Sequence, residues 1–293
     1  MRPPHLVAHS VMVRMLFDES FAAAVARAPH EVLPMLPAAL AEQLGAVDPR
    51  ALRRDRHRVE RTLGYLCAEL PAATLLAVAE QGRMTILLDF FRSTQLHEAL
   101  HEGMSLVLAL AAYLELKLAE GALRSPHVAA VLAIEVASAH ARRSGEDAPQ
   151  PKPSLMRDDT PLRRARGVEV VTVPAGTLAA LQIVEQHRFR MGLVPAWTVA
   201  TDPPALPALP KLGPARCSLA VVSIAKHVSL VEIDAALFAV LSSLPSGTTR
   251  TKEAVRNEAE ARLGDVAAID AAIASLIEDE LVLASAEAAT SSG

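Results

Sequence analysis

Residues 217 to 233, CSLAVVSIAKHVSLVEI, decide the fold of the C-terminal part of the chain. Two runs rich in β-branched residues, CSLAVVSI and HVSLVEI, are separated by only two residues, Ala225 and Lys226. Two strand-like runs with so short a connection predict a β-hairpin.

Three helices and a final strand are predicted after this hairpin. Asp234 is a suitable N-cap for the first helix, because its carboxylate accepts hydrogen bonds from the unpaired N–H groups there. The segments are DAALFAVLSSL (234–244), TRTKEAVRNEAEARL (249–263), DVAAIDAAIASLIEDE (265–280) and the strand LVLA (281–284). A hairpin followed by three short helices and a terminal strand is a winged-helix-like layout, which we predict for residues 216–285.

Residues 1–145 are predicted to form a helical domain. The hydrophobic fraction of 51% is carried by Ala, Leu and Val, with aromatic residues at only 3%, and this composition favours helices packed through small side chains. Helix boundaries are marked by a cap at Asp18, by Gly45 as a stop, and by Asp48 followed by Pro49 as a start.

The pattern changes after this domain. Residues 146–165 are rich in proline and charge and have no apolar period, so we predict a linker. Residues 166–293 are predicted to form an α/β domain that opens with the strand VEVVTV at 168–173 and contains the winged-helix-like unit. The predicted fold class is therefore α+β and mostly α.

Composition excludes several classes of protein. The formal net charge of −4 argues against a surface built as a whole to grip nucleic acid. Cys67 and Cys217 lie far apart, which indicates a reduced protein without a cysteine metal site. The N-terminus lacks the apolar core of a signal peptide, and the longest charge-free apolar run, residues 105–114, is roughly half of what spans a bilayer. We expect a cytoplasmic location without membrane contact.

The segment QLHEALHEGM, residues 95–104, contains the H-E-x-x-H pattern of zinc metallopeptidases as His97, Glu98 and His101. Glu120 lies at the spacing of a third ligand in one class of these enzymes. The sequence between Met104 and Glu120 has no turn signal, and one unbroken helix would carry Glu120 about 24 Å beyond Met104. We therefore expect no metal site and interpret the histidines as part of an ordinary helix.

The charge pattern of two segments argues against nucleic-acid binding. The six arginines between residues 50 and 61 are interleaved with Asp55 and Glu60, which favours a solvated helix face. The third C-terminal helix, residues 265–280, has no basic residue and several acidic residues. Its carboxylates would repel the phosphates of a nucleic acid. A winged-helix transcription regulator stays open as the alternative function, with a zinc metallopeptidase behind it. DNA retention that falls with salt would favour the regulator.

Four segments resemble successive blocks of one protein family. They are DPRALRRDRHRVERTLGYLCAELP (48–71), LLDFFRSTQLHEALHEGMSLVLALAAYL (87–114), LAIEVASAHARR (132–143) and VEVVTVPAGTLAAL (168–181). The family comprises the partner proteins of multinuclear non-haem iron-dependent oxidative enzymes, as in methanobactin and thiaglutamate biosynthesis. The resemblance covers most of residues 45–285, and the block around FFRSTQLHEALHEGMSL is the most specific.

The resemblance implies a non-catalytic subunit that binds a ribosomally made precursor peptide and presents it to a TIM-barrel iron enzyme. It implies no cofactor on this chain, because the iron belongs to the partner. The winged-helix-like unit is similar to the peptide-recognition element of peptide-modifying systems. Co-purification with an iron protein would favour this interpretation over the transcription regulator.

We predict the docking site of the leader peptide from the residues themselves. The strand HVSLVEI can leave one edge unpaired, along Val228, Leu230 and Glu232, for an extended peptide to join as a further strand. The peptide side chains would then rest on the third helix, whose isoleucines recur every four residues and share a face. These are Ile269, Ile273 and Ile277. Their alternative role is to fill the core of the small domain.

Overall fold

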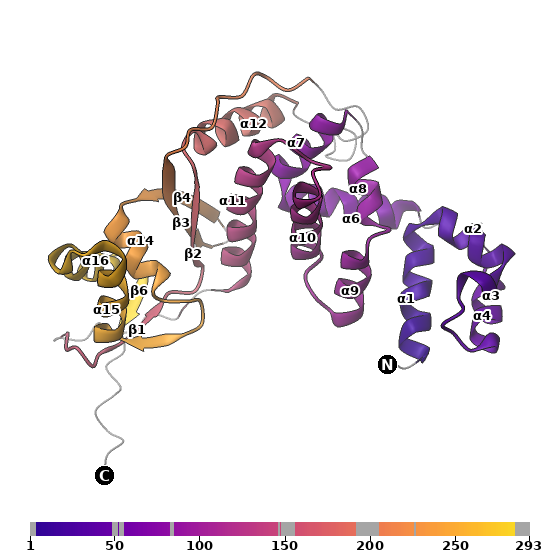
Figure 1. The fold of residues 1–293 in the computed structure, drawn as a ribbon, viewed down its shortest axis with the longest axis horizontal. Helices are drawn as coiled ribbons and strands as arrows, with labels where there is room; N and C mark the ends of the chain where they lie inside the picture. The colour runs from indigo at the N-terminus through magenta and orange to yellow at the C-terminus, as the bar shows by residue number, and fades with distance from the viewer. Residues whose placement is uncertain are drawn as a thin grey trace, which may run out of the picture. The chain divides into compact units, whose positions relative to one another are not determined.

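The chain is mostly helical, with small antiparallel sheets, in the computed structural model (Figure 1). This confirms the predicted α+β, mostly α, class. The structure describes residues 4–48, 52, 56–82, 85–145, 147, 156–191, 205–225 and 227–284. Asp48 is described, but Pro49 and three of the six arginines of residues 50–61 (Arg50, Arg53 and Arg54) lie outside the described part.

The described residues belong to two compact units. The first comprises residues 1–132 and 179–210, and the second comprises 133–178 and 211–293. The predicted domains divide the chain once, between residues 145 and 166. Each observed unit instead consists of two separate stretches of the chain.

The first unit is helical. Its helices are α1 (Pro4–Phe17), α2 (Glu19–Arg27), α3 (Pro29–Val32), α4 (Ala38–Gly45), α6 (Arg56–Glu69), α7 (Pro71–Gln81), α8 (Thr85–Phe90), α9 (Thr94–Glu102) and α10 (Leu106–Ala119). Two longer helices, α11 (Pro126–Arg143) and α12 (Thr177–Met191), contribute residues to both units.

Side-chain caps fix several helix starts in this unit. Asp18 accepts a hydrogen bond from the N–H of Phe21, which confirms the predicted cap of α2. Ser93 and Ser105 do the same for α9 and α10. A capping side chain satisfies an N–H group that has no partner within the helix. Glycine ends α9, because Gly103 adopts a left-handed conformation with φ of 67°.

The second unit contains two three-stranded antiparallel sheets. One has the order β5-β1-β6, with β1 (Pro161–Arg164) between β5 (Thr249–Thr251) and β6 (Val282–Ala284). The other has the order β2-β3-β4 and consists of β2 (Val168–Pro174), β3 (Arg216–Ile224) and β4 (His227–Ile233). The predicted hairpin is therefore present as β3 and β4.

Three capped helices complete the second unit. They are α14 (Ala235–Ser242), α15 (Lys252–Leu263) and α16 (Val266–Glu278), and their caps are Asp234, Thr251 and Asp265. Helix α14 packs against α15, α16, β2 and β3. One buried core takes residues from all of these elements, among them Leu162 of β1, Ala220 of β3, Val240 of α14 and Ile269 of α16.

Strand pairing differs from the predicted layout of residues 216–285. The hairpin pairs with β2, and the terminal strand β6 pairs with β1. Strand β1 lies inside the predicted linker 146–165, and β5 begins the segment predicted as the second helix. Neither strand has an apolar run, because β1 is PLRR and β5 is TRT. Pairing with neighbouring strands, rather than local sequence, determines these two strands.

Leu162 tests whether β1 belongs to the folded unit. Its side chain is fully buried in the middle strand of its sheet. We expect Leu162→Ala to lower the free energy of unfolding by about 2–5 kcal/mol, because truncation leaves a cavity in the core. Urea unfolding followed by circular dichroism measures the change. Leu116→Ala, the same substitution at an exposed position, is the control, and equal effects of both variants would contradict the packing described for β1.

Candidate functional site

The unpaired backbone of β4 follows from the hydrogen bonds of β3. Ser223 of β3 donates its N–H to the carbonyl of Gly167, beside β2. Successive residues of an antiparallel strand alternate between its two neighbours. Odd-numbered residues of β3 therefore bond to β2, and even-numbered residues bond to β4.

The register carries this alternation onto β4. Ser229 and Val231 lie opposite Val222 and Ala220, so their peptide groups point inward to β3. Leu230 lies opposite Val221, an odd-numbered residue, so its peptide group points away from β3. The same holds for Val228 and Glu232, opposite Ser223 and Leu219. Among the described strands, β4 pairs with β3 alone, so this outer row forms a sheet edge.

Side chains of β4 lie on both faces of the sheet. Val228 and Leu230 are half-buried, and Glu232 is exposed. Val231 lies on the opposite face, the face of Ala220 and α14, where 49% of it is exposed. Ile224, at the end of β3, is 69% exposed. The edge is thus flanked by apolar side chains that water reaches.

The isoleucines predicted for the site lie elsewhere. Ile269 and Ile273 are almost completely buried in the core of the second unit, and Ile277 is partly buried against the same core. Helix α14 packs against β2 and β3 of this sheet. The structure therefore brings Val228, Leu230 and Glu232 together on one edge and assigns the three isoleucines of α16 to the core.

The H-E-x-x-H segment forms α9, which packs against α1 and α10. Both ring nitrogens of His97 are buried and have no hydrogen-bond partner among the described residues. Burial lowers the pKa of His97, as does the nearby Arg14, while Asp18 opposes them. Glu98 is exposed, and Glu120 pairs with Lys117 at 2.7 Å. Within the described ranges, no three His, Cys, Asp or Glu side chains come together as metal ligands.

Asp18 is the buried carboxylate of this region. Burial alone raises its pKa, but hydrogen bonds from Ser20 and Phe21, together with the charges of Arg92 and Arg14, outweigh burial and hold the pKa below its ordinary value. The Ser20 hydroxyl donates at 2.6 Å and the Phe21 N–H at 3.0 Å. Because its bonds are satisfied within this unit, Asp18 acts as a structural carboxylate.

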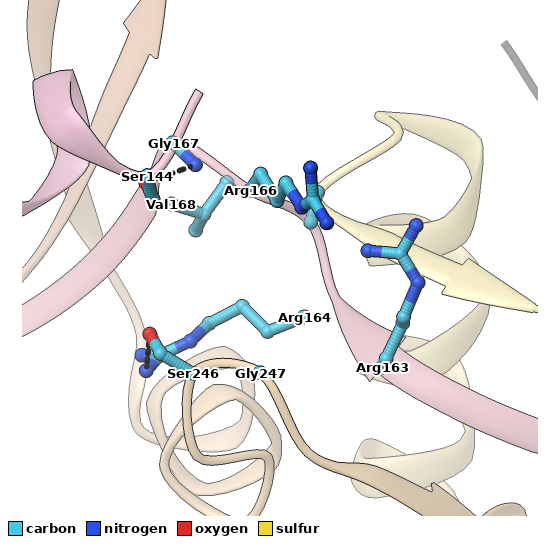
Figure 2. A pocket seen from close by; sticks show the side chains of 9 residues that line it. Ser144, Arg163, Arg164, Arg166, Gly167, Val168, Ser246 and Gly247 are labelled. Carbon is cyan, nitrogen blue, oxygen red and sulfur yellow. Dashed lines mark hydrogen bonds between the residues drawn. The ribbon is translucent and has the colours of Figure 1, made fainter. Parts of the chain in front are cut away.

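A pocket of about 560 Å³ lies in the second unit. It is lined by the end of α11, the junction of β1 and β2, and the turn after α14 (Figure 2). Figure 2 shows the side chains of Arg163 and Arg166 turned toward one another, whereas Arg164 extends to Ser246. These arginines fall in or beside the predicted linker, so sequence analysis missed them. The cluster RRAR at 163–166 is the signal that could have indicated them.

Two carboxylates hold this arginine cluster. Asp147 accepts two hydrogen bonds from Arg163, at 2.6 and 3.0 Å, and one from the Arg166 N–H at 2.6 Å. Burial alone raises the pKa of Asp147, but these bonds and charges hold it below its ordinary value. Glu169 lies 3.3 Å from Arg164. Burial lowers the pKa of Arg164, and the charge of Glu169 opposes that effect.

Gly167 gives the pocket its shape. Its φ of +79° is unfavourable for other residues, and an added Cβ would lie 2.8 Å from the carbonyl oxygen of Ser223. Its N–H donates to the Ser144 hydroxyl at 2.8 Å, which ties the strand junction to the end of α11. Glycine at this position therefore lets β1 turn into β2 against β3.

No protein-family model, curated protein or solved structure matches the chain. Within the described ranges, no single helix has the length and apolar character that a membrane span needs. One pair, Arg61–Glu69 with Pro71–Gln81, passes the same test by length and composition but is bent by 109°.

His97 makes a testable contribution to stability. Because burial lowers its pKa in the folded state, the unfolded chain takes up a proton first as the pH falls through about 6.5, and stability is lost. We expect His97→Gln to lose less stability than the wild type between pH 7.5 and 5.5. Thermal unfolding across this range measures the difference. His101→Gln removes one imidazole from the same helix as a control, and an equal effect of both variants would contradict the role of His97.

Proposed function

We propose that this chain is a peptide-binding subunit and that an extended peptide joins the edge of β4 as a fourth strand. The observation that carries the proposal is the outward row of peptide groups at Val228, Leu230 and Glu232 on a strand with one partner. Such an edge supplies main-chain hydrogen bonds to any extended segment. The affinity then comes from the backbone, and the flanking side chains select the sequence.

The side chains around the edge favour a peptide with apolar residues at alternate positions. A strand added to β4 directs every second side chain to the face of Val231, the face on which α14 packs against β2 and β3. Leu237 and Ala236 of α14 are partly buried there, against the core. The other peptide side chains lie on the face of Leu230, which is half-buried. We therefore propose α14, in place of α16, as the helix beside the docked peptide.

The identity of the partner rests on the resemblance described above. Family members are non-catalytic subunits that present a precursor peptide to a multinuclear non-haem iron enzyme. A subunit with that role needs a peptide-binding surface and no metal ligands of its own, and the β4 edge supplies such a surface. We propose that the ligand is the leader of a ribosomally made precursor peptide and that the iron belongs to the partner.

The alternative, a winged-helix transcription regulator, is less well supported. In that class the third helix of the unit enters the DNA groove and needs basic residues. Helix α16, the third helix here, contains no Lys or Arg, and Asp270, Glu278, Asp279 and Glu280 lie on it or directly after it. Repulsion between these acids and phosphates opposes DNA binding. A free strand edge has no such conflict with a peptide.

Leu230→Pro tests the edge directly. Proline removes an N–H from the outward row and leaves the inward bonds of Ser229 and Val231 to β3 in place. We expect the affinity for a synthetic extended peptide with apolar residues at alternate positions to fall by about tenfold, since one main-chain hydrogen bond is lost. Isothermal titration calorimetry measures the change.

Leu230→Val is the matched control, because it keeps the N–H and the apolar character of the position. Circular dichroism must show both variants folded. If Leu230→Pro binds the peptide as tightly as Leu230→Val, the peptide docks somewhere other than on β4.

A further inference from the structure

Within the described part of the chain, the pocket at Arg163, Arg164 and Arg166 carries more positive charge than its carboxylates neutralise. Among the described residues, its ion pairs join these three guanidinium groups to two carboxylates, Asp147 and Glu169. Three positive charges against two negative charges leave one positive charge in excess. A concave surface with such an excess attracts anions.

Arg164 is the buried member of the cluster. It is 8% exposed, its Nη2 donates to the Ser246 hydroxyl at 2.7 Å, and Ser246 in turn donates to Glu169 at 2.8 Å. Its Nε is buried and has no hydrogen-bond partner among the described residues. A buried N–H without an acceptor is unfavourable. A ligand oxygen that reached this nitrogen would complete the hydrogen bonds of the guanidinium.

Arg166 is the accessible member. Its side chain is 64% exposed, and its Nε lies 3.8 Å from Asp147, beyond hydrogen-bond distance. Arg163, in contrast, already binds Asp147 through two hydrogen bonds. The three arginines of the pocket thus differ. Arg163 is held by Asp147, Arg164 is buried, and the guanidinium of Arg166 is able to turn toward a ligand.

We propose that this pocket binds a small oxyanion, a carboxylate or a phosphate, with Arg166 as the guanidinium that closes on it. Guanidinium groups present paired N–H donors that match the oxygens of these anions. The volume of about 560 Å³ accommodates such an ion together with the group that carries it. The site is formed by the junction of β1 and β2 and is separate from the outward row of β4. It therefore adds a ligand to the chain independently of the proposed peptide edge.

The test uses the full chain with sodium phosphate and, separately, sodium succinate, each titrated at an ionic strength held constant with sodium chloride. Isothermal titration calorimetry gives the dissociation constant. We expect at least one anion to bind and Arg166→Gln to raise its dissociation constant about tenfold, because a charged hydrogen bond is lost. Arg157→Gln is the control, since that side chain is 69% exposed, faces Asp159 and loses the same charge outside the pocket lining.

The two titrations also identify the source of the oxyanion. Binding of phosphate alone assigns the pocket to phosphoryl groups, binding of succinate alone assigns it to carboxylates, and binding of both supports a general oxyanion site. The proposal is overturned if neither anion binds beyond chloride at equal ionic strength. It is also overturned if Arg157→Gln weakens binding as much as Arg166→Gln, because the effect would then come from general surface charge.

Discussion

The hydrogen-bond ladder of β3 is the constraint on which the rest of the second unit depends. As the middle strand, β3 forms backbone hydrogen bonds to β2 through its odd-numbered residues and to β4 through its even-numbered residues. The bond from the Ser223 N–H to the Gly167 carbonyl fixes this alternation. A shift of one residue would move the buried Leu219 and Val221 to the other face. Burial thus holds the register, and the register determines which peptide groups of β4 point outward.

A second constraint joins the two sheets. Leu162, in the middle strand of one sheet, and Ala220, in the middle strand of the other, belong to one buried core with α14 and α16. The short connection from Arg164 to Val168 must turn from one sheet to the other, and Gly167 permits the turn. The arginine pocket arises at this connection. The feature that links the sheets therefore also concentrates the charge.

The hairpin, the three C-terminal helices and their caps were predictable, because the signals for them are local. Residues 217–233 alternate strand runs with a two-residue connection, and Asp234 marks a helix start. Strands β1 and β5 were not predictable, because their sequences PLRR and TRT carry no strand pattern. Pairing between distant segments holds these strands in place. Pairing of the hairpin with β2 was missed for the same reason.

The candidate site was predictable in part. The edge residues of β4 follow from the hairpin, but their outward direction requires the register with β3. The spacing of Ile269, Ile273 and Ile277 indicated a shared face correctly, yet spacing alone does not distinguish a core from a binding surface. The arginine pocket depends on Asp147, Ser246 and Glu169, which are brought together only by the tertiary fold.

Amide-resolved hydrogen exchange on β4, with and without the same synthetic extended peptide, tests the central claim most directly. In the free chain, Ser229 and Val231 are expected to exchange slowly because they bond to β3, whereas Val228, Leu230 and Glu232 exchange fast. Saturating peptide should slow the three fast amides and leave the other two unchanged. Unchanged exchange at Val228, Leu230 and Glu232 with the peptide bound would contradict strand addition at this edge.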